Sequence, residues 1–313
     1  MENNNMTEFD FLENDFELIN EHHDIYHEKA IPVASFWHDF IKRLTKNKGA
    51  CIGGVCIIII VIMSIIGPMM SDFLYDKIDM TIANLKASGD HWFGTDTFGR
   101  DLWVRVWRGA RISLFVAVAA VVIDICFGMI YGLISGYFGG KVDTVMQRIQ
   151  EIISSIPSLV ILSLLIMVMD ASLYTIIIAL MITGWIGMSR ITRAQVLKIK
   201  EEEFVLASKT LGAGSFFLIF KNILPNIFGQ LIIMSMFSIP NAIFYEAFLA
   251  FVGLGVPTPE ASLGTLVNEG FRSIMAYPHM IITPIIVLAV LMLSFNLLAD
   301  GLRDAFDPTM KEM

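Results

Sequence analysis

Cysteine is scarce in this sequence, and no disulfide or zinc pattern is present. The 313 residues include three cysteines, Cys51, Cys56 and Cys126, and each lies inside an apolar run. They cannot form the disulfide framework of a small secreted domain, and their spacing does not match that of a zinc site. We interpret them as small apolar packing residues.

Motifs for nucleotide hydrolysis and for nucleophilic catalysis are also missing. No stretch matches G-x-x-x-x-G-K-[ST], so the chain has no phosphate-binding loop of its own and is not expected to hydrolyse ATP alone. The six histidines lie outside the long apolar runs, which leaves no Ser-His or Cys-His arrangement for an intramembrane protease. The sequence therefore predicts a protein that is not an enzyme, without catalytic, cofactor-binding or metal-binding residues.

Positive charge is absent from the first 28 residues, which contain nine Asp and Glu residues but no Lys or Arg. Such a segment stays solvated, and we expect residues 1–33 to form a mobile acidic tail. The segment lacks the basic start and the early apolar run of a secretory signal peptide. We interpret its histidines, His22, His23 and His27, as polar surface residues rather than metal ligands.

Charged residues are few in the chain as a whole, at 17%, whereas hydrophobic residues make up 55% and the mean hydropathy is +0.66. This composition predicts an all-α integral membrane protein. A spanning helix needs about 20 apolar residues, because the hydrocarbon core is about 30 Å thick and a helix rises about 1.5 Å per residue. Six segments meet this requirement: 50–70, 112–138, 156–171, 172–190, 226–256 and 280–300.

The segment 34–49, just before the first span, has the pattern of an amphipathic helix. Its bulky apolar side chains share one helical face, and its basic side chains carry positive charge, which is typical of a helix that lies in the membrane interface. An extension of the first span is the alternative. The chain would then consist of the acidic tail 1–33, the interfacial helix 34–49 and a six-helix membrane domain at 50–313.

The distribution of basic residues predicts the orientation of the chain in the membrane. If the N-terminus is cytoplasmic, fifteen of the 22 Lys and Arg residues fall in cytoplasmic segments and seven fall outside. Lys and Arg are enriched on the cytoplasmic side of membrane proteins, so we expect both termini to be cytoplasmic. The segment Lys200 to Pro225 then also lies in the cytoplasm.

This segment, 200–225, is a short polar and amphipathic stretch between two apolar runs. Its pattern predicts a helix, a glycine turn and a second helix. One face of the first helix combines bulky residues at each end with small residues between them, and such a face could lie close against another protein. An ordinary loop resting on lipid headgroups is the alternative. The face comprises Phe204, Ala207, Ser208 and Leu211, and the turn follows at Gly212.

Two carboxylates, Asp124 and Glu246, lie within predicted spans, where an unpaired charge is costly. Each could line a substrate path or gate, or could serve only in hydrogen bonding between helices. A proton-coupled carrier would have more such groups, so that class is a minor alternative. Gly128, Gly132 and Gly136 recur every four residues in the second span and predict close packing of another helix.

Breaks within and between the spans are predicted from turn-forming residues. Asp170 marks a minimal turn, so the third and fourth spans should form a hairpin. Pro240 should bend the fifth span, and the glycines and prolines at 253–259 should end it. We also expect a short helix at 263–271 in the last outer loop, and a structural cap, rather than a substrate site, in the outer loop 71–110.

Several stretches of the chain resemble a known family. Leu206-Ala207-Ser208, Gly212 and Leu224-Pro225 match the coupling motif of ABC importer permeases, Glu-Ala-Ala with a later Gly and Leu-Pro, although Leu206 and Ser208 replace its glutamate and second alanine. Further matches, in one register from about residue 34 to residue 308, resemble the C-type permease subunit of dipeptide and oligopeptide ABC importers. They are FGTDTFGRD at 93–101, SGYFGGKVD at 135–143, EAFLAFVGLGVPTP at 246–259 and LLADGLRDAFDP at 297–308.

This resemblance implies a type I ABC importer permease fold in a bacterial plasma membrane. It implies a heterodimer with a second, related permease, two cytoplasmic ATPases that bind ATP and Mg²⁺, and an extracellular peptide-binding protein or lipoprotein. It implies contacts with membrane lipid and none with nucleic acid. It also implies that the segment 200–225 couples to an ATPase through Glu203, Phe204, Ala207, Ser208, Leu211, Gly212 and Pro225.

Three alternatives remain at this point. Related ABC permeases carry nickel chelates or other small solutes, although the spans offer no cluster of metal ligands. An ion-coupled secondary transporter would act without ATPases. A purely structural membrane scaffold would explain neither the amphipathic segment 200–225 nor the intramembrane carboxylates.

Overall fold

The structure, a computed structural model, describes residues 36–170 and 172–306, and within these ranges every regular element is a helix. The chain divides into two units, Met1–Lys42 and Arg43–Met313, and of the first unit only residues 36–42 are described. The boundary falls inside α1 (Phe36–Lys46), which lies in the segment predicted to be an amphipathic helix. The predicted acidic tail, residues 1–33, lies outside the described residues. The interfacial position of the segment 34–49 stays a prediction.

Five continuous helices in the described part of the chain are long and apolar enough to cross a membrane, as predicted from composition. Their main elements are α2 (Lys48–Ile66), α3 (Leu102–Ile123) with α4 (Met129–Phe138), α7 (Leu173–Ile199), α10 (Leu224–Leu249) and α12 (His279–Phe306). α7 and α12 each form a whole span, and the other three spans join two or more elements. The five spans are Lys48–Met70, Leu102–Phe138, Leu173–Ile199, Ser215–Leu254 and His279–Phe306.

The second span begins about ten residues earlier than the predicted 112, because α3 starts at Leu102, where the side chain of Asp101 accepts a hydrogen bond from the backbone N–H of Val104 at 3.0 Å. The predicted outer loop therefore ends before Arg105 and Arg108. These arginines are accommodated in the helix by carboxylates: Arg105 pairs with Glu269 and Arg108 with Glu260. Hydropathy alone placed both arginines outside the span.

The predicted span 156–171 contains only the second helix of a bent pair, not one straight helix long enough to cross the membrane. α5 (Gly140–Ser154) and α6 (Ser158–Met169) meet at an angle of 74°. The 12 residues of α6 extend only about 18 Å, which is less than the hydrocarbon thickness of about 30 Å. Pro157 interrupts the chain between the two helices. The described residues thus contain six spans only if the bent pair counts as one.

The hairpin predicted near Asp170 is present, because α6 and α7 contact each other and contribute to one apolar cluster, which includes Leu162, Ile176 and Ile177. The fifth span contains Pro240 and ends in a π-helix, η6 (Ala250–Leu254), where Gly253 has a φ of 92°. The non-helical Gly253 confirms the predicted break, whereas α10 continues through Pro240 and the bend there stays a prediction. The short helix predicted at 263–271 is α11 (Leu263–Arg272).

The glycine repeat of the second span confirms the predicted close packing between helices. A Cβ atom at Gly128 would lie 2.6 Å from the carbonyl oxygen of Trp185, and one at Gly132 would lie 2.5 Å from that of Ser189. A Cβ at Gly136 would meet the side chain of Val196 at 2.8 Å. α4 and α7 can therefore approach this closely only without side chains at these positions.

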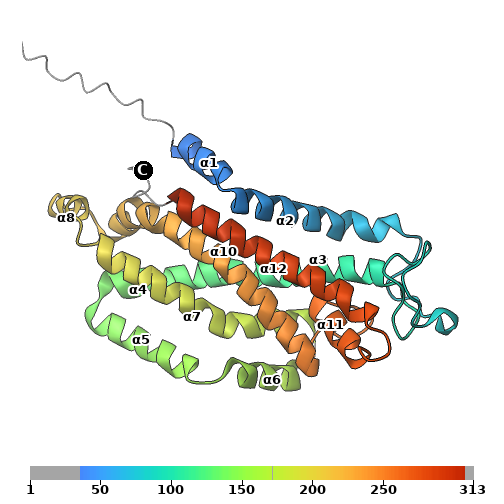
Figure 1. The fold of residues 1–313 in the computed structure, drawn as a ribbon. Coiled ribbons are helices and arrows are strands. Elements are labelled where there is room, and N and C mark those ends of the chain that lie inside the picture. Colours follow the sequence, from blue (N-terminus) through green and yellow to red (C-terminus); the bar gives the residue numbers. More distant parts are fainter. Residues whose placement is uncertain (1–35, 171, 307–313) are drawn as a thin grey trace, which may run out of the picture. The chain divides into compact units, whose positions relative to one another are not determined.

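The core of the unit Arg43–Met313 lies between α2, α3, α10, α11 and α12, where Val106, Ile243, Leu263 and Leu291 are fully buried. Figure 1 shows α10 and α12 running the length of this unit, with α8 (Glu203–Thr210) at one end and α11 at the other. The three cysteines are free, and Cys51 and Cys126 are exposed. Only Cys56, which is half-buried, fits the predicted packing role.

Buried charged side chains link the parts of the loop 71–101, which fits the interpretation as a structural cap. Asp96 is fully buried and accepts hydrogen bonds from the backbone N–H groups of Phe98 and Arg100 and from the Arg100 Nε at 2.6 Å. Asp101 contacts His91 Nδ1 at 2.8 Å. Gly94 and Gly99 have left-handed backbone conformations, which allow the chain to turn tightly within this loop.

Candidate functional site

The segment 200–225 folds as a helix, a glycine turn and a second helix, as its sequence predicts. α8 carries Glu203 in its first turn and Lys209 in its last, the favourable order for the helix dipole. Gly212 ends it with a φ of 87°. The Gly212 N–H donates a hydrogen bond to the Lys209 carbonyl oxygen at 3.0 Å, and the Ala213 N–H donates one to the Ser208 carbonyl oxygen at 3.1 Å. These two bonds form a Schellman cap, which requires the left-handed conformation that glycine adopts readily.

We call residues 203–223 the α8 hairpin. Its second arm, α9 (Ser215–Phe217) and the π-helix η5 (Leu218–Ile223), continues into α10 without a break. Pro225 lies at the start of α10, so the second helix of the segment 200–225 runs directly into the apolar segment that follows. Proline lacks an N–H and cannot make the usual bond to the preceding turn, and the π-helix directly before Pro225 accommodates that loss.

A buried residue that the sequence pattern did not single out anchors the α8 hairpin. Val205 is 3% exposed and packs in an apolar cluster with Leu218, Ile219 and Ile223 from the second arm. Asn222 also donates a hydrogen bond to the Ser208 hydroxyl at 2.8 Å. The first arm of the α8 hairpin is therefore packed against the start of the continuous helix Ser215–Leu254.

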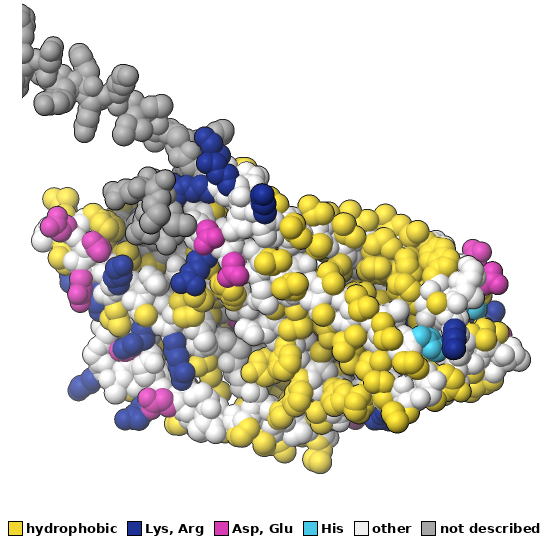
Figure 2. All heavy atoms as spheres, in the orientation of Figure 1, with side chains coloured by type: hydrophobic (Ala, Val, Ile, Leu, Met, Phe, Trp, Pro, Cys, Tyr) yellow, Lys and Arg dark blue, Asp and Glu magenta, His cyan; other side chains and the backbone are white. Residues whose placement is uncertain are grey.

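The helical face predicted to contact another protein is largely exposed. Phe204 and Leu211 are 44% and 88% exposed, Ala207 is exposed, and Ser208 is half-buried. The sequence interpretation missed Phe216, which is 75% exposed and whose ring packs 4.4 Å from that of Phe220. Glu203 and Pro225 are also exposed. The α8 hairpin thus presents bulky apolar side chains beside charged ones, at the end of the molecule where Figure 2 shows both basic and acidic side chains.

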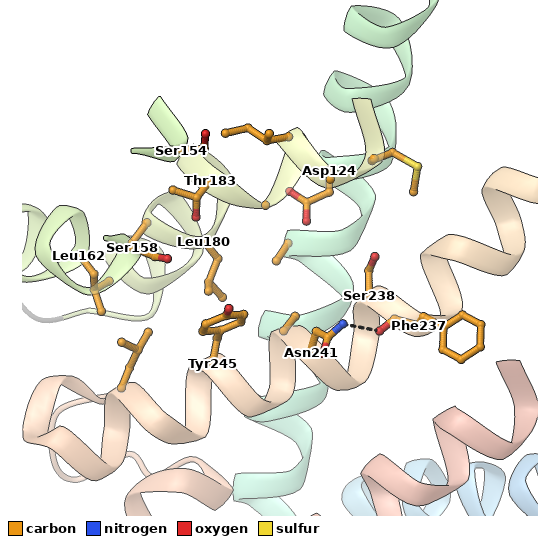
Figure 3. A pocket seen from close by; sticks show the side chains of 18 of the residues that line it. Asp124, Ser154, Ser158, Leu162, Leu180, Thr183, Phe237, Ser238, Asn241 and Tyr245 are labelled. Atoms are coloured by element: carbon orange, nitrogen blue, oxygen red, sulfur yellow. Dashed lines mark hydrogen bonds between the residues drawn. The ribbon is translucent and has the colours of Figure 1, made fainter. Parts of the chain in front are cut away.

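A cavity of about 510 Å³ lies between the spanning helices. Residues of η4 (Asp124–Gly128), α6, α7 and α10 line it, and most of them are apolar. Asp124, Thr183, Ser238 and Asn241 add polar groups, which Figure 3 shows converging from three different elements. The volume falls within the range of about 300 to 1,000 Å³ that is typical of small-molecule sites.

The two intramembrane carboxylates have different surroundings. Asp124 lines the cavity, whereas Glu246 is not among the residues that line it. Glu246 is fully buried and accepts a hydrogen bond from the Ser113 hydroxyl at 2.8 Å, and the same hydroxyl accepts one from the backbone N–H of Leu263. Glu246 thus connects α10 with α3 and α11, which matches the alternative role of hydrogen bonding between helices.

Ion pairs join α3 to α11 and to the loop that precedes α11. Arg108 donates from Nε and Nη2 to the two carboxylate oxygens of Glu260, and its guanidinium lies 3.6 Å from the centre of the Tyr75 ring. The hydrogen bonds from Arg108 hold the pKa of Glu260 below its usual value. The described residues contain no group of three or more His, Cys, Asp or Glu that could hold a metal ion.

Two family models match the sequence. Residues 128–312 match the binding-protein-dependent transport system inner membrane component, and residues 35–87 match the N-terminal TM domain of oligopeptide transport permease C. Together the two models extend over the predicted interfacial segment from residue 35, the first span, and the chain from Gly128 to residue 312.

Curated proteins match over most of the chain. The oligopeptide transport system permease protein OppC of Bacillus subtilis is 46% identical over 89% of this chain and 91% of its own length. The dipeptide transport system permease protein DppC of the same organism is 46% identical over 90% of this chain and 88% of its own length. OppC of Escherichia coli K12 is 39% identical over 88% of this chain and 91% of its own length.

One solved structure has a similar fold at low sequence identity. A chain of the MetNI methionine ABC transporter, in an inward facing conformation, superposes with a TM-score of 0.54 and 20% identity. The match covers 65% of this chain and 97% of that one.

Proposed function

Because the chain belongs to the family of inner membrane components of binding-protein-dependent transport systems, we propose that it is a permease subunit of an ATP-driven importer of oligopeptides or dipeptides. Its fold is the type I ABC importer permease fold that the resemblance implied. The observation that carries the proposal is the 46% identity to the oligopeptide permease OppC over 89% of the chain.

The α8 hairpin is the proposed contact with a cytoplasmic ATPase. Glu203, Phe204, Ala207, Ser208, Leu211, Gly212 and Pro225 are its proposed coupling residues. Exposed apolar side chains on a rigidly anchored helix suit insertion into a cleft of a partner protein. ATP and Mg²⁺ would bind to the ATPase, and this chain would take no part in the hydrolysis.

The direct connections of the α8 hairpin explain how a movement at the ATPase would reach the membrane. The second arm belongs to the continuous helix Ser215–Leu254, and the first arm follows α7 after a short turn. A displacement of the α8 hairpin would therefore shift α7 and α10, two helices that line the cavity. Both termini would be cytoplasmic, on the side of the α8 hairpin.

This chain would form half of the translocation path. A second, homologous permease would supply the other half of a heterodimer, and two ATPases would bind on the cytoplasmic side. An extracellular peptide-binding protein or lipoprotein would deliver the cargo, and membrane lipid would surround the spans. The high share of apolar side chains on the visible surface in Figure 2 suits such a lipid environment.

Gentle detergent extraction of the tagged chain, followed by mass spectrometry and an ATPase assay, tests this function. We expect a second permease to remain bound, together with two ATPase subunits. These subunits can be two different chains or two copies of one chain. ATP hydrolysis should rise when peptide-loaded binding protein is added. A lone chain that moves solute in liposomes under an ion gradient would overturn the proposal.

A further inference from the structure

The strongest unassigned feature of the structure is the carboxylate of Asp124 in the cavity. The Asp124 side chain belongs to a spanning helix, and the residue is 8% exposed. Its Oδ1 atom is buried and has no hydrogen-bond partner. No Lys, Arg or His among the described residues forms an ion pair with it. A buried carboxylate without a partner is costly, so this one has the properties of a binding group rather than of a packing group.

The backbone around Asp124 leaves space for this carboxylate. Gly184 of α7 lies opposite, and a Cβ atom there would meet the Asp124 Oδ1 at 2.6 Å. Asp124 is also the first residue of the π-helix η4, and π-helical turns inside α-helices occur frequently at functional sites. The absence of a side chain at 184 therefore keeps the carboxylate beside the cavity.

The rest of the cavity wall indicates what kind of molecule fits beside Asp124. Among the described residues that line the cavity, Asp124 is the only Asp, Glu, Lys, Arg or His. Thr183, Ser238, Asn241 and Tyr245 supply neutral donors and acceptors, and apolar side chains make up most of the remainder. One negative charge, several neutral polar groups and an apolar wall suit a molecule with one cationic end, amide groups and small side chains.

We propose that Asp124 binds the α-ammonium group of a peptide as the cargo passes through this cavity. The proposal rests on the proposed function, because it takes its cargo from the peptide importers. A charged hydrogen bond from the ammonium group would satisfy the buried carboxylate, and the neutral polar side chains would contact the peptide amides. The cavity is larger than one Lys or Arg side chain needs, which favours the cargo over a basic side chain of the second permease.

Peptide uptake by the complete complex in proteoliposomes tests the role of Asp124. The matched variants are Asp124→Asn, Asp124→Glu and, as a control, Asp170→Asn in the exposed turn between α6 and α7. The probe is trialanine, whose α-ammonium is its only cation. Asp124→Asn should lower trialanine uptake at least about tenfold, the equivalent of about 1.4 kcal/mol. Asp124→Glu should retain part of the uptake, and Asp170→Asn should leave it unchanged.

Two further measurements distinguish this inference from a failure of assembly. The Asp124→Asn complex should retain the second permease and should hydrolyse ATP within about twofold of wild type when loaded binding protein is added. Unchanged trialanine uptake by this variant would overturn the proposal. Loss of the second permease on purification would also overturn it and would assign Asp124 to an ion pair between subunits. A defect confined to lysine-containing peptides would overturn the assignment to the α-ammonium group.

A complex whose wild-type form does not carry trialanine at all would instead contradict the proposed function. That outcome differs from a failure of the Asp124 proposal, because it is seen in the wild-type complex before any variant is compared with it.

Discussion

Arg193 and Asp143 form a two-pronged ion pair between helices that lie far apart in the sequence. The Nε and Nη2 atoms of Arg193 donate to the Oδ1 and Oδ2 atoms of Asp143, each at 2.6 Å. The Ser135 hydroxyl donates to the same carboxylate. Asp143 lies in the first turn of α5, and Arg193 lies in the last part of α7, shortly before the α8 hairpin. The pair therefore connects the bent helices α5 and α6 to the proposed coupling region.

Removing this pair should lower the stability of the protein. Asp143→Asn should reduce the free energy of unfolding by about 1 to 3 kcal/mol, because hydrogen bonds to a half-buried charged group are worth more than neutral ones. Thermal inactivation of the purified complex measures the effect. Arg148 and Glu151, an exposed pair at the same 2.6 Å distance, provide the control. Glu151→Gln should change stability by less than about 1 kcal/mol, and an equal loss in both variants would contradict the importance of the Asp143 pair.

Gly212→Leu should uncouple the transporter without preventing its insertion into the membrane. A Cβ at Gly212 meets nothing within 4 Å, so the substitution acts through the backbone φ of 87°. Leucine disfavours that conformation, and the Schellman cap of α8 should be lost. ATP hydrolysis stimulated by peptide-loaded binding protein should disappear.

Gly214→Leu is the matched control for Gly212→Leu. Gly214 also has open space around its Cβ position, but its φ is −70°, which leucine tolerates. This variant should retain stimulated hydrolysis. Normal stimulation in a correctly assembled Gly212→Leu complex would refute the coupling role of the turn.

Local sequence patterns predicted those parts of the fold and of the site that are determined by residues close together in the sequence. Hydropathy identified the spans, the four-residue glycine spacing predicted the contact of α4 with α7, and Gly212 predicted the turn. Asp124 was recognised because a carboxylate stands out in an apolar run. Each of these signals is contained in a few consecutive turns of one helix.

Features that depend on contacts between distant segments could not be predicted in this way. The early start of α3 requires Glu260 and Glu269 to neutralise arginines more than 150 residues away. Val205 looks like one apolar residue among many until Leu218 and Ile219 pack on it. The bend before α6 had a local signal in Pro157, but the apolar composition of the segment concealed it.

Acidification should remove the stabilising effect of Glu260. Hydrogen bonds from Arg108 lower the pKa of Glu260 in the folded protein below its ordinary value of 4.5. The pair therefore contributes stability fully above the unfolded pKa and loses that contribution as the pH falls through the folded pKa. Glu260→Gln should melt below wild type at neutral pH, and the two should converge as the pH falls below the folded pKa of Glu260.

Melting temperatures of the purified complex, measured across this pH range, test the role of Glu260. Asp90→Asn, which removes an exposed carboxylate from the outer loop, is the control and should follow wild type. A melting difference for Glu260→Gln that stays constant at every pH would show that the carboxylate acts through packing rather than through its charge.

Close contact between α4 and α7 should make Gly132→Ala destabilising. The added Cβ would lie 2.5 Å from the carbonyl oxygen of Ser189, and both atoms belong to helix backbones that cannot move independently. The helices must separate, at a cost of about 1 to 3 kcal/mol. Gly54→Ala in α2 makes the same change where nothing lies within 4 Å, and it should be neutral or stabilise the helix by up to about 1 kcal/mol. Equal thermal inactivation of the two variants would mean that the glycine spacing does not determine the contact of α4 with α7.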